Sequence, residues 1–145
     1  MSAYSHILLA VDFSTHTDAI TEKALSLSKA FGARISLVHI VEFVQVDLSN
    51  ELVMPQEMEL DQELMELAEK RLKQLASRYA IEDSDCIISQ GSTRKEILRI
   101  AKEKNVDLII IGSHGREGIQ LLLGSTANAV LHGAPCDVLA VRIRD

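Results

Sequence analysis

Five short apolar runs, separated by four stretches with helical periodicity, constrain the fold of this chain more than any other feature. The runs are nearly continuous rather than alternating in polarity, which is typical of strands covered on both faces, as in parallel sheets. Strands that alternate with helices in this way form a parallel sheet with right-handed crossovers. The predicted strands lie at residues 7–11, 34–42, 86–88, 108–111 and 137–143.

The stretches between the runs repeat apolar residues every three or four positions, which predicts amphipathic helices. In the longest of them, one face is expected to be buried and the acidic residues are expected on a solvated face. The predicted buried face carries Leu60, Leu64, Leu67, Arg71, Leu75 and Tyr79, with Ala68 and Leu72 beside them. Thr93 and Glu96 have the spacing of a capping box, which predicts where the third helix begins. The predicted helices span about residues 18–31, 57–79, 93–104 and 125–133.

The segment at residues 43–55 fits neither pattern, because it mixes apolar and polar side chains without a clear period. An ordered flap over the sheet edge and a loop that contacts a partner protein are both open interpretations. No internal repeat, low-complexity tract or linker divides the 145 residues. We therefore expect a single domain over residues 1–145.

Charge and composition exclude several classes of function. The net charge of −6 disfavours broad attraction to nucleic acid or anionic lipid, and an aromatic content of 3% without Trp disfavours a base-stacking platform. The apolar run at residues 7–11 is too short for a signal peptide or a membrane span. Cys86 and Cys136 form no CxxC pair and fit buried thiols in a reducing compartment. We expect a cytoplasmic protein that binds neither nucleic acid nor membrane.

The densest cluster of glycines follows the fourth predicted strand. In open parallel sheets, ligands bind beyond the carboxyl ends of the strands, where the strand order reverses. Four of the seven glycines lie between Gly112 and Gly124, and Gly124 with Ser125 leads into a helix, whose N-terminal N–H groups favour a phosphate. A turn followed by an ordinary helix cap explains the same residues, so both interpretations stay open. The GxGxxG and GK[ST] motifs of other nucleotide sites are absent.

Together, these residues resemble the universal stress proteins, particularly the small single-domain bacterial members. The resemblance covers nearly the whole chain and rests on residues 4–14, 37–40, 107–115 and 121–127, in that order. It implies an α/β fold with an open, doubly wound parallel sheet of five strands in the order 3-2-1-4-5. Helices would cover both faces, in a Rossmann-like architecture similar to the adenine nucleotide alpha hydrolases. The order would reverse between the first and fourth strands.

The resemblance also implies a homodimer joined through the last strand, at residues 137–143. An apolar strand left on an open sheet edge favours aggregation. Pairing with its own copy across a two-fold axis removes that edge. The dimer therefore has a physical reason as well as a family precedent.

Universal stress proteins divide into members that bind ATP through the pattern Gly-x2-Gly-x9-Gly-(Ser/Thr) and members that lack these glycines and bind no known nucleotide. Here Gly112 and Gly115 keep their spacing and Gly124 is followed by Ser125, but eight residues rather than nine separate Gly115 from Gly124. Loops tolerate a change of length better than strands or helices do. The loss of one phosphate contact would nevertheless weaken the binding free energy by about 1.5–3 kcal/mol. Since each 1.4 kcal/mol corresponds to about a tenfold change in affinity, such a loss would weaken nucleotide binding by at least tenfold.

The resemblance assigns a role to each candidate site residue. Asp12 would accept hydrogen bonds from the adenine or ribose; capping of the following turn is the alternative. Ala10 and Ile40 would line the adenine slot, or belong to the plain core. Ile111 and Gly112 would contact the nucleoside. The phosphates would be bound by Gly115, Gly124, Ser125 and Thr126.

The leading hypothesis is a dimeric stress-response regulator that binds ATP, with or without Mg²⁺, and whose nucleotide state is read by protein partners. The alternative is a dimeric adaptor of the same family that binds no nucleotide and acts through protein contacts. No set of nucleophile, base and orienting partner is recognisable, so we expect at most slow ATP hydrolysis or autophosphorylation. None of the five histidines has the spacing of a metal-ligand pair, and no metal site is expected.

Overall fold

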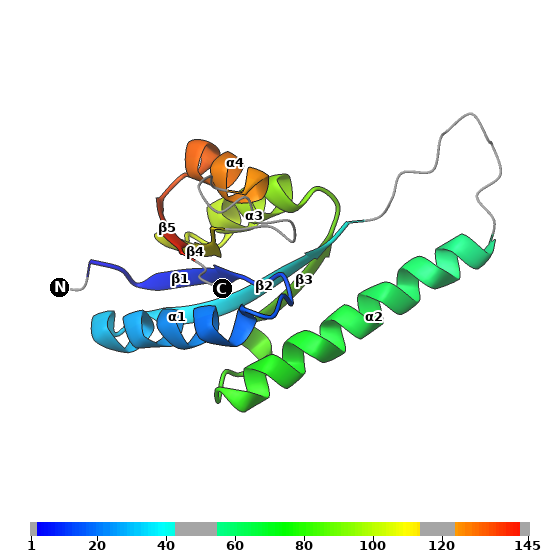
Figure 1. Cartoon of the computed structure of the whole chain (residues 1–145), viewed down its shortest axis with the longest axis horizontal. Coiled ribbons are helices and arrows are strands. Elements are labelled where there is room, and N and C mark those ends of the chain that lie inside the picture. Colours follow the sequence, from blue (N-terminus) through cyan, green and yellow to red (C-terminus); the bar gives the residue numbers. More distant parts are fainter. Residues whose placement is uncertain (1–2, 43–54, 114–123, 143–145) are drawn as a thin grey trace.

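The computed structural model describes residues 3–42, 55–113 and 124–142, which form a five-stranded parallel sheet between two layers of helices (Figure 1). The strand order is β3-β2-β1-β4-β5, and every neighbouring pair is parallel. The doubly wound sheet expected from the sequence is thereby confirmed. The strands are β1 (His6–Ala10), β2 (Arg34–Val41), β3 (Cys86–Gln90), β4 (Leu108–Gly112) and β5 (Asp137–Val141).

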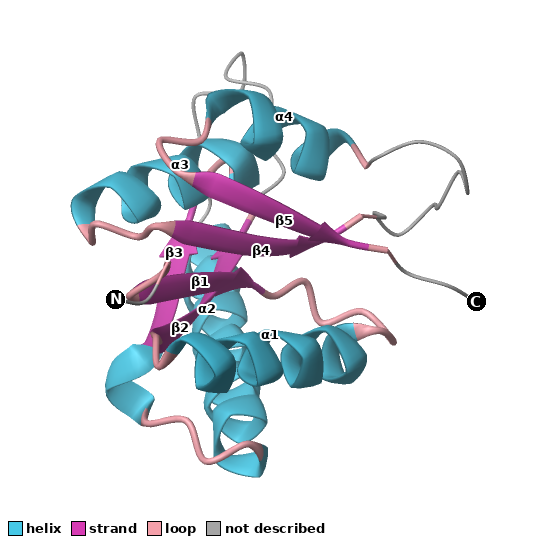
Figure 2. Cartoon of the chain, turned by 90° about the vertical axis from the view of Figure 1, so that its left-hand side faces the viewer, coloured by secondary structure: helices cyan, strands magenta, loops and turns pink. Residues whose placement is uncertain are grey.

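Two helices cover each face of the sheet. Figure 2 shows α1 and α2 on one side, with α3 and α4 on the other. A short 3-10 turn, η1 (Asp83–Asp85), precedes β3. Helix α1 ends at Gly32, whose φ of +63° is a backbone conformation that side-chain-bearing residues rarely adopt. The helices are α1 (Thr17–Phe31), α2 (Pro55–Arg78), α3 (Thr93–Glu103) and α4 (Ser125–Gly133).

The strands face two separate apolar cores, which explains why their sequences are continuously apolar. In β1, Ile7 and Leu9 belong to the core beneath α1 and α2, whereas Leu8 belongs to the core beneath α3 and α4. In β4 the same alternation places Ile110 in the first core and Ile109 in the second. All five side chains are at most 1% exposed. Strands buried on both faces have no solvent side and therefore no polar alternation.

Only the second half of the face predicted for α2 is buried. Leu60, Leu64 and Leu67 are 54%, 40% and 52% exposed, so their predicted burial is wrong. The predicted burial of Ala68, Leu72 and Leu75 is confirmed. The first half of α2 extends past the sheet, and only its second half lies against the strands (Figure 1). A period of 3.6 residues tells which positions share a face, but not how far the neighbouring sheet reaches. The buried residues are Ala68, Leu72, Leu75 and Ala76.

The start of α3 is capped from another element rather than by a capping box. Its N-cap is Ser92, which makes no side-chain cap bond. The Thr93 N–H instead donates to Oε1 of Glu42, just after β2, at 2.8 Å, and this contact holds the pKa of Glu42 below its ordinary value. Glu96 accepts the hydroxyl of Ser89 at 2.6 Å. The expected box is therefore wrong, because a carboxylate brought in by the sheet takes the Thr93 N–H.

Replacement of Glu96 with Gln is expected to lower stability at pH 7 by about 1 kcal/mol, the scale of a partly exposed ion pair. Hydrogen bonds from Arg99 and Ser89 lower the pKa of Glu96 from 4.5 to about 2. A depressed pKa stabilises the folded state above the unfolded-state value, and this contribution is lost as the pH falls from about 4.5 to about 2. Urea unfolding at pH 7 and pH 3 measures the effect.

Glu103→Gln is the matched control, because Glu103 also pairs with Arg99 at 2.9 Å but has a more exposed side chain, 58% against 20%. We expect a smaller loss of stability for this variant at pH 7. An unchanged acid dependence in the Glu96→Gln protein would contradict the prediction.

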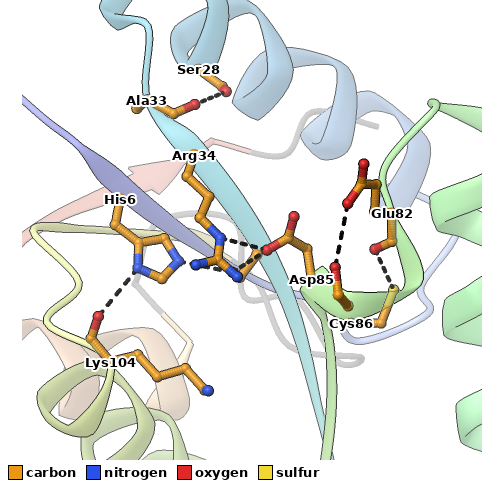
Figure 3. Close-up of polar contacts among 10 residues, drawn as sticks. His6, Ser28, Ala33, Arg34, Glu82, Asp85, Cys86 and Lys104 are labelled. Carbon is orange, nitrogen blue, oxygen red and sulfur yellow. Dashed lines mark hydrogen bonds and ion pairs between the residues drawn. The ribbon is translucent and has the colours of Figure 1, made fainter.

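The edge of the sheet where the strands begin is tied together by polar contacts (Figure 3). Arg34 Nε lies 2.7 Å from Oδ1 of Asp85. The imidazole of His6 contacts the carbonyl of Lys104 through Nδ1 at 3.2 Å and the hydroxyl of Ser36 through Nε2 at 2.8 Å. These polar groups are therefore engaged in holding strands and helices together at the edge opposite the predicted ligand site.

Candidate functional site

The chain stays hydrogen-bonded to β2 as it leaves β1. The Val11 N–H donates to the carbonyl of Val38 at 2.8 Å, and Nδ1 of His39 lies 2.6 Å from the carbonyl of Val11. Because a carbonyl only accepts, the imidazole proton of His39 lies on Nδ1. The backbone is thus held in place immediately before Asp12.

Asp12 caps the turn that follows β1 and keeps accepting capacity on one oxygen. Its Oδ1 accepts the Ser14 N–H at 3.0 Å and the Thr17 hydroxyl at 3.4 Å. Both contacts use the same oxygen, and within residues 3–42, 55–113 and 124–142 Oδ2 has no hydrogen-bond partner. The carboxyl is exposed at the surface. The capping role is therefore observed, and no residue of the described ranges hydrogen-bonds to Oδ2.

The two ends of the glycine-rich segment meet at the end of β4. The Ser113 N–H donates to the carbonyl of Val141 at 2.9 Å, and the Gly124 N–H donates to the carbonyl of Ser113 at 2.7 Å. The second bond places the start of α4 directly beside the end of β4. The intervening residues 114–123, including Gly115 of the predicted site, lie outside the described residues.

The register of the sheet brings Asp12 and the start of α4 to the same edge. Leu9 is paired with Ile110, so the same register continued by two residues sets Val11 opposite Gly112. Because β1 pairs with β2 on one side and β4 on the other, this edge lies where the strand order reverses. Ligands of open parallel sheets bind at this kind of position.

Helix α4 presents its first turn at this edge. Gly124 is the N-cap and, within the described residues, no side chain caps the helix. Ser125 is exposed and Thr126 is half-buried. The first N–H groups of a helix have no partner within it and carry its positive dipole end. This turn is therefore suited to an anion.

The three apolar residues of the predicted site lie in one cluster beneath α3 and α4. Ile40 and Ile111 are 5% and 7% exposed, and they pack with Ala127 from the first turn of α4. Ala10 is half-buried and packs against the same cluster. The two isoleucines thus serve the core, and Ala10 retains more surface for a ligand.

The sequence does not predict a role for two residues of this site. Phe13 has a φ of +55°, in the left-handed region that bulky residues seldom occupy. Thr17, the first residue of α1, donates its hydroxyl to Asp12. No pattern in the sequence marks either residue, because the first depends on backbone conformation and the second on the path of the turn.

A hollow lies elsewhere in the molecule, between α2 and β3, and has different chemistry. It has a volume of about 590 Å³ and is lined in part by Glu69, Lys73 and Cys86. Lys73 pairs with Glu69 at 3.0 Å, and burial raises the pKa of the Cys86 thiol, which lowers its nucleophilicity at neutral pH. Among the described residues there is no group of three acidic, Cys or His side chains that could hold a metal ion. The edge shared by β1 and β4 is therefore the better candidate.

The model of the universal stress protein family matches residues 3–142, essentially the whole chain. The chain belongs to the universal stress protein family. Universal stress protein A homolog 2 of Coxiella burnetii is 44% identical over 145 residues, with 99% of each chain covered. Universal stress protein A homolog 1 of the same organism is 33% identical over 142 residues, with 98% of this chain and 99% of that one covered.

Solved structures agree on the fold. Protein MJ0577, whose biochemical function was assigned from its structure, superposes with a TM-score of 0.79 at 26% identity, with 98% of each chain covered. Universal stress protein UspA from Lactobacillus plantarum gives a TM-score of 0.72 at 24% identity, over 99% of this chain and all of that one. Among the described residues of this universal stress protein, no helix has the length and apolar character needed to cross a membrane.

Proposed function

We propose that this universal stress protein binds an adenine nucleotide, with ATP as its ligand, at the carboxyl ends of β1 and β4. The hydrogen bond from the Gly124 N–H to the carbonyl of Ser113 supports this most directly. It places the helix N-terminus of α4 at the same edge as the carboxylate of Asp12. One part of the site suits an anion and the other accepts hydrogen bonds, as phosphate and nucleoside require.

Each end of the nucleotide has its own set of residues in this proposal. Oδ2 of Asp12 accepts hydrogen bonds from the ribose or adenine, and Ala10 offers apolar surface to the base, backed by Ile40 and Ile111. Gly112 contacts the nucleoside. The phosphates, with Mg²⁺ where it is bound, lie against Gly115, Gly124, Ser125 and Thr126.

The first experiment asks whether nucleotide copurifies with the protein. Protein prepared without added ligand is denatured, and the supernatant is separated by anion exchange beside ATP, ADP, AMP and cyclic AMP standards. Cyclic AMP is included because a universal stress protein 21% identical to this one, with a TM-score of 0.65, was solved in complex with cAMP. Near-stoichiometric ATP, or calorimetric binding of added ATP and Mg²⁺ in the micromolar range, is the expected result. An empty supernatant together with no heat of binding at millimolar ATP would reject the proposal.

A second candidate function is a dimeric adaptor that acts through protein contacts and binds no nucleotide. The eight-residue spacing between Gly115 and Gly124 favours it, as does the exposed apolar stripe of Leu60, Leu64 and Leu67 on α2. In either case we propose a cytoplasmic, single-domain regulator of the stress response, with at most slow ATP turnover.

We also propose that two copies pair through β5, the edge strand beside β4. Leu139 on this strand is 36% exposed. We expect Leu139→Asp to convert a dimer into a monomer, measured by light scattering on a sizing column, because a carboxylate would be desolvated in the interface. Leu131→Asp is the matched control, since Leu131 is 46% exposed but lies on α4. A Leu139→Asp protein that remains dimeric would place the interface elsewhere.

A further inference from the structure

The backbone is strained immediately after Asp12. Phe13 has a φ of +55°, where the Cβ of an L residue approaches the following carbonyl. Glycine avoids this cost, and a phenylalanine adopts the conformation only where its surroundings compel it. Strain of this kind collects at functional sites. Phe13 lies between Asp12 and Ser14, so the strained residue is at the edge proposed to bind the nucleotide.

Two side chains from other elements hold the Phe13 ring. The imidazole of His39, on β2, lies 4.4 Å from it between ring centroids, tilted by 44°. The guanidinium carbon of Arg71, on α2, lies 4.4 Å from the ring centroid, a cation–π geometry. The imidazole is itself held by the carbonyl of Val11. The ring is therefore in contact with both β2 and α2.

Helix α2 and the residue that follows it also contact the start of α1. Arg78 Nη2 lies 3.0 Å from Oδ1 of Asp18, and the hydroxyl of Tyr79 donates to the same oxygen at 2.9 Å. Arg71 and Arg78 are two turns apart and thus lie on the same side of the helix. Helix α2 therefore contacts the turn after β1 at Phe13 and the first turn of α1 at Asp18.

We propose that Phe13 is a positioning residue for the nucleotide site, held in its left-handed conformation by His39 and Arg71. This inference rests on the proposed function. If Phe13 relaxed to an ordinary backbone conformation, Ser14 and Thr17 would swing away from Oδ1 of Asp12. The carboxylate would then have to be reordered each time a ligand binds, at the expense of affinity. Phe13 and Arg71 thus set the affinity without touching the ligand.

The test combines two readouts on the full-length protein. Calorimetry measures the dissociation constant for ATP, and hydrogen exchange of the Ser14 N–H, followed by NMR without ligand, measures the order of the turn. We expect Phe13→Gly, which removes both the strain and the ring, to weaken ATP binding by about tenfold or more, as for one misplaced hydrogen bond to a charged group. Arg71→Ala should weaken binding by about two- to fivefold, as for one exposed cation–π contact. Both variants should exchange the Ser14 N–H faster.

Three further variants separate positioning from general stability. Phe13→Tyr keeps the aromatic ring between His39 and Arg71 and should bind ATP within about twofold of the wild type. Lys70 is exposed and precedes Arg71 in the sequence. Lys70→Ala should leave both the affinity for ATP and the exchange of the Ser14 N–H unchanged. Ile35→Ala removes a buried side chain at the opposite edge of the sheet and should lower stability but not affinity.

The outcomes distinguish this inference from the proposed function. Wild-type affinity in both Phe13→Gly and Arg71→Ala would overturn it even though nucleotide binds. Should the wild type bind no nucleotide, the proposed function fails, and the positioning role is then decided by exchange of the Ser14 N–H alone. Unchanged exchange in both variants would overturn the inference in that case also.

Discussion

Leu72→Ala is expected to lower the free energy of unfolding by about 2–5 kcal/mol, the range for truncating a fully buried leucine. Leu72 is 0% exposed and belongs to the core beneath α1 and α2. Truncation removes apolar contacts and leaves a cavity that the surrounding core fills only in part. Leu64→Ala, on the same helix, should change stability by less than about 0.5 kcal/mol, because Leu64 is 40% exposed and alanine favours helix.

Urea unfolding followed by circular dichroism measures both variants, with the slope of each transition checked against the wild type. The pair isolates burial, since the substitution and the helix are the same. If Leu64→Ala were as costly as Leu72→Ala, the first half of α2 would have to be covered in solution. That result would contradict the exposed leucine stripe and weaken the adaptor alternative built on it.

Asp12→Ala is expected to weaken ATP binding by about 10- to 100-fold, the equivalent of losing one hydrogen bond to a charged acceptor. The substitution removes Oδ2, the oxygen proposed to face the nucleoside. It also removes Oδ1, so the contacts with the Ser14 N–H and the Thr17 hydroxyl are lost and the turn loosens. Both effects act in the same direction. Calorimetry with ATP and Mg²⁺ measures the loss, with circular dichroism to verify that the variant is folded.

Two companion variants separate these effects. Asp12→Asn keeps one acceptor oxygen for the turn but removes the negative charge. Its loss of affinity for ATP should therefore be smaller than that of Asp12→Ala. Thr17→Val removes only a hydroxyl that lies 3.4 Å from Oδ1, and we expect at most a few-fold loss. Wild-type affinity in Asp12→Ala would remove this carboxylate from the proposed site.

The sequence predicted the elements of the fold closely because their signals are local. The predicted strand at residues 108–111 is observed as Leu108–Gly112, and the helix predicted at residues 125–133 is observed as Ser125–Gly133. Runs of β-branched and aliphatic residues bounded by Asp or Gly need no distant partner to be recognised. The order of the strands, by contrast, was implied by the family resemblance and is confirmed by the register.

Two local predictions failed because distant partners competed with local ones. The Thr93 N–H is bonded to Glu42 rather than by a capping box, and Leu67 is exposed although its spacing is that of a buried face. In both cases the alternative depends on where another element lies. A side chain far away in the sequence or the limited extent of a sheet leaves no trace in a short window of residues.

In the candidate site, too, some residues were predicted from the sequence and others were found only in the structure. The glycine cluster from Gly112 to Gly124 was visible in the sequence, because it follows a strand at the end of the sheet where ligands bind. The family resemblance added the role of Asp12. The capping role of Asp12 appeared only with the turn itself. Phe13 could not be found beforehand, since its residue type argues against a left-handed backbone and only the packing of His39 and Arg71 imposes it.

The sequence by itself determined the class of fold, the positions of the strands and helices, and the family, because these follow from periodicity and from motifs in a set order. The tertiary structure decided which half of α2 is buried, what caps α3, and how the turn after β1 is held. These depend on contacts between residues far apart in the chain, whose free energy arises only once the sheet has brought them together. The hydrogen bond between Gly124 and Ser113 is of this kind, and it makes one edge of the sheet the place where a nucleotide is expected.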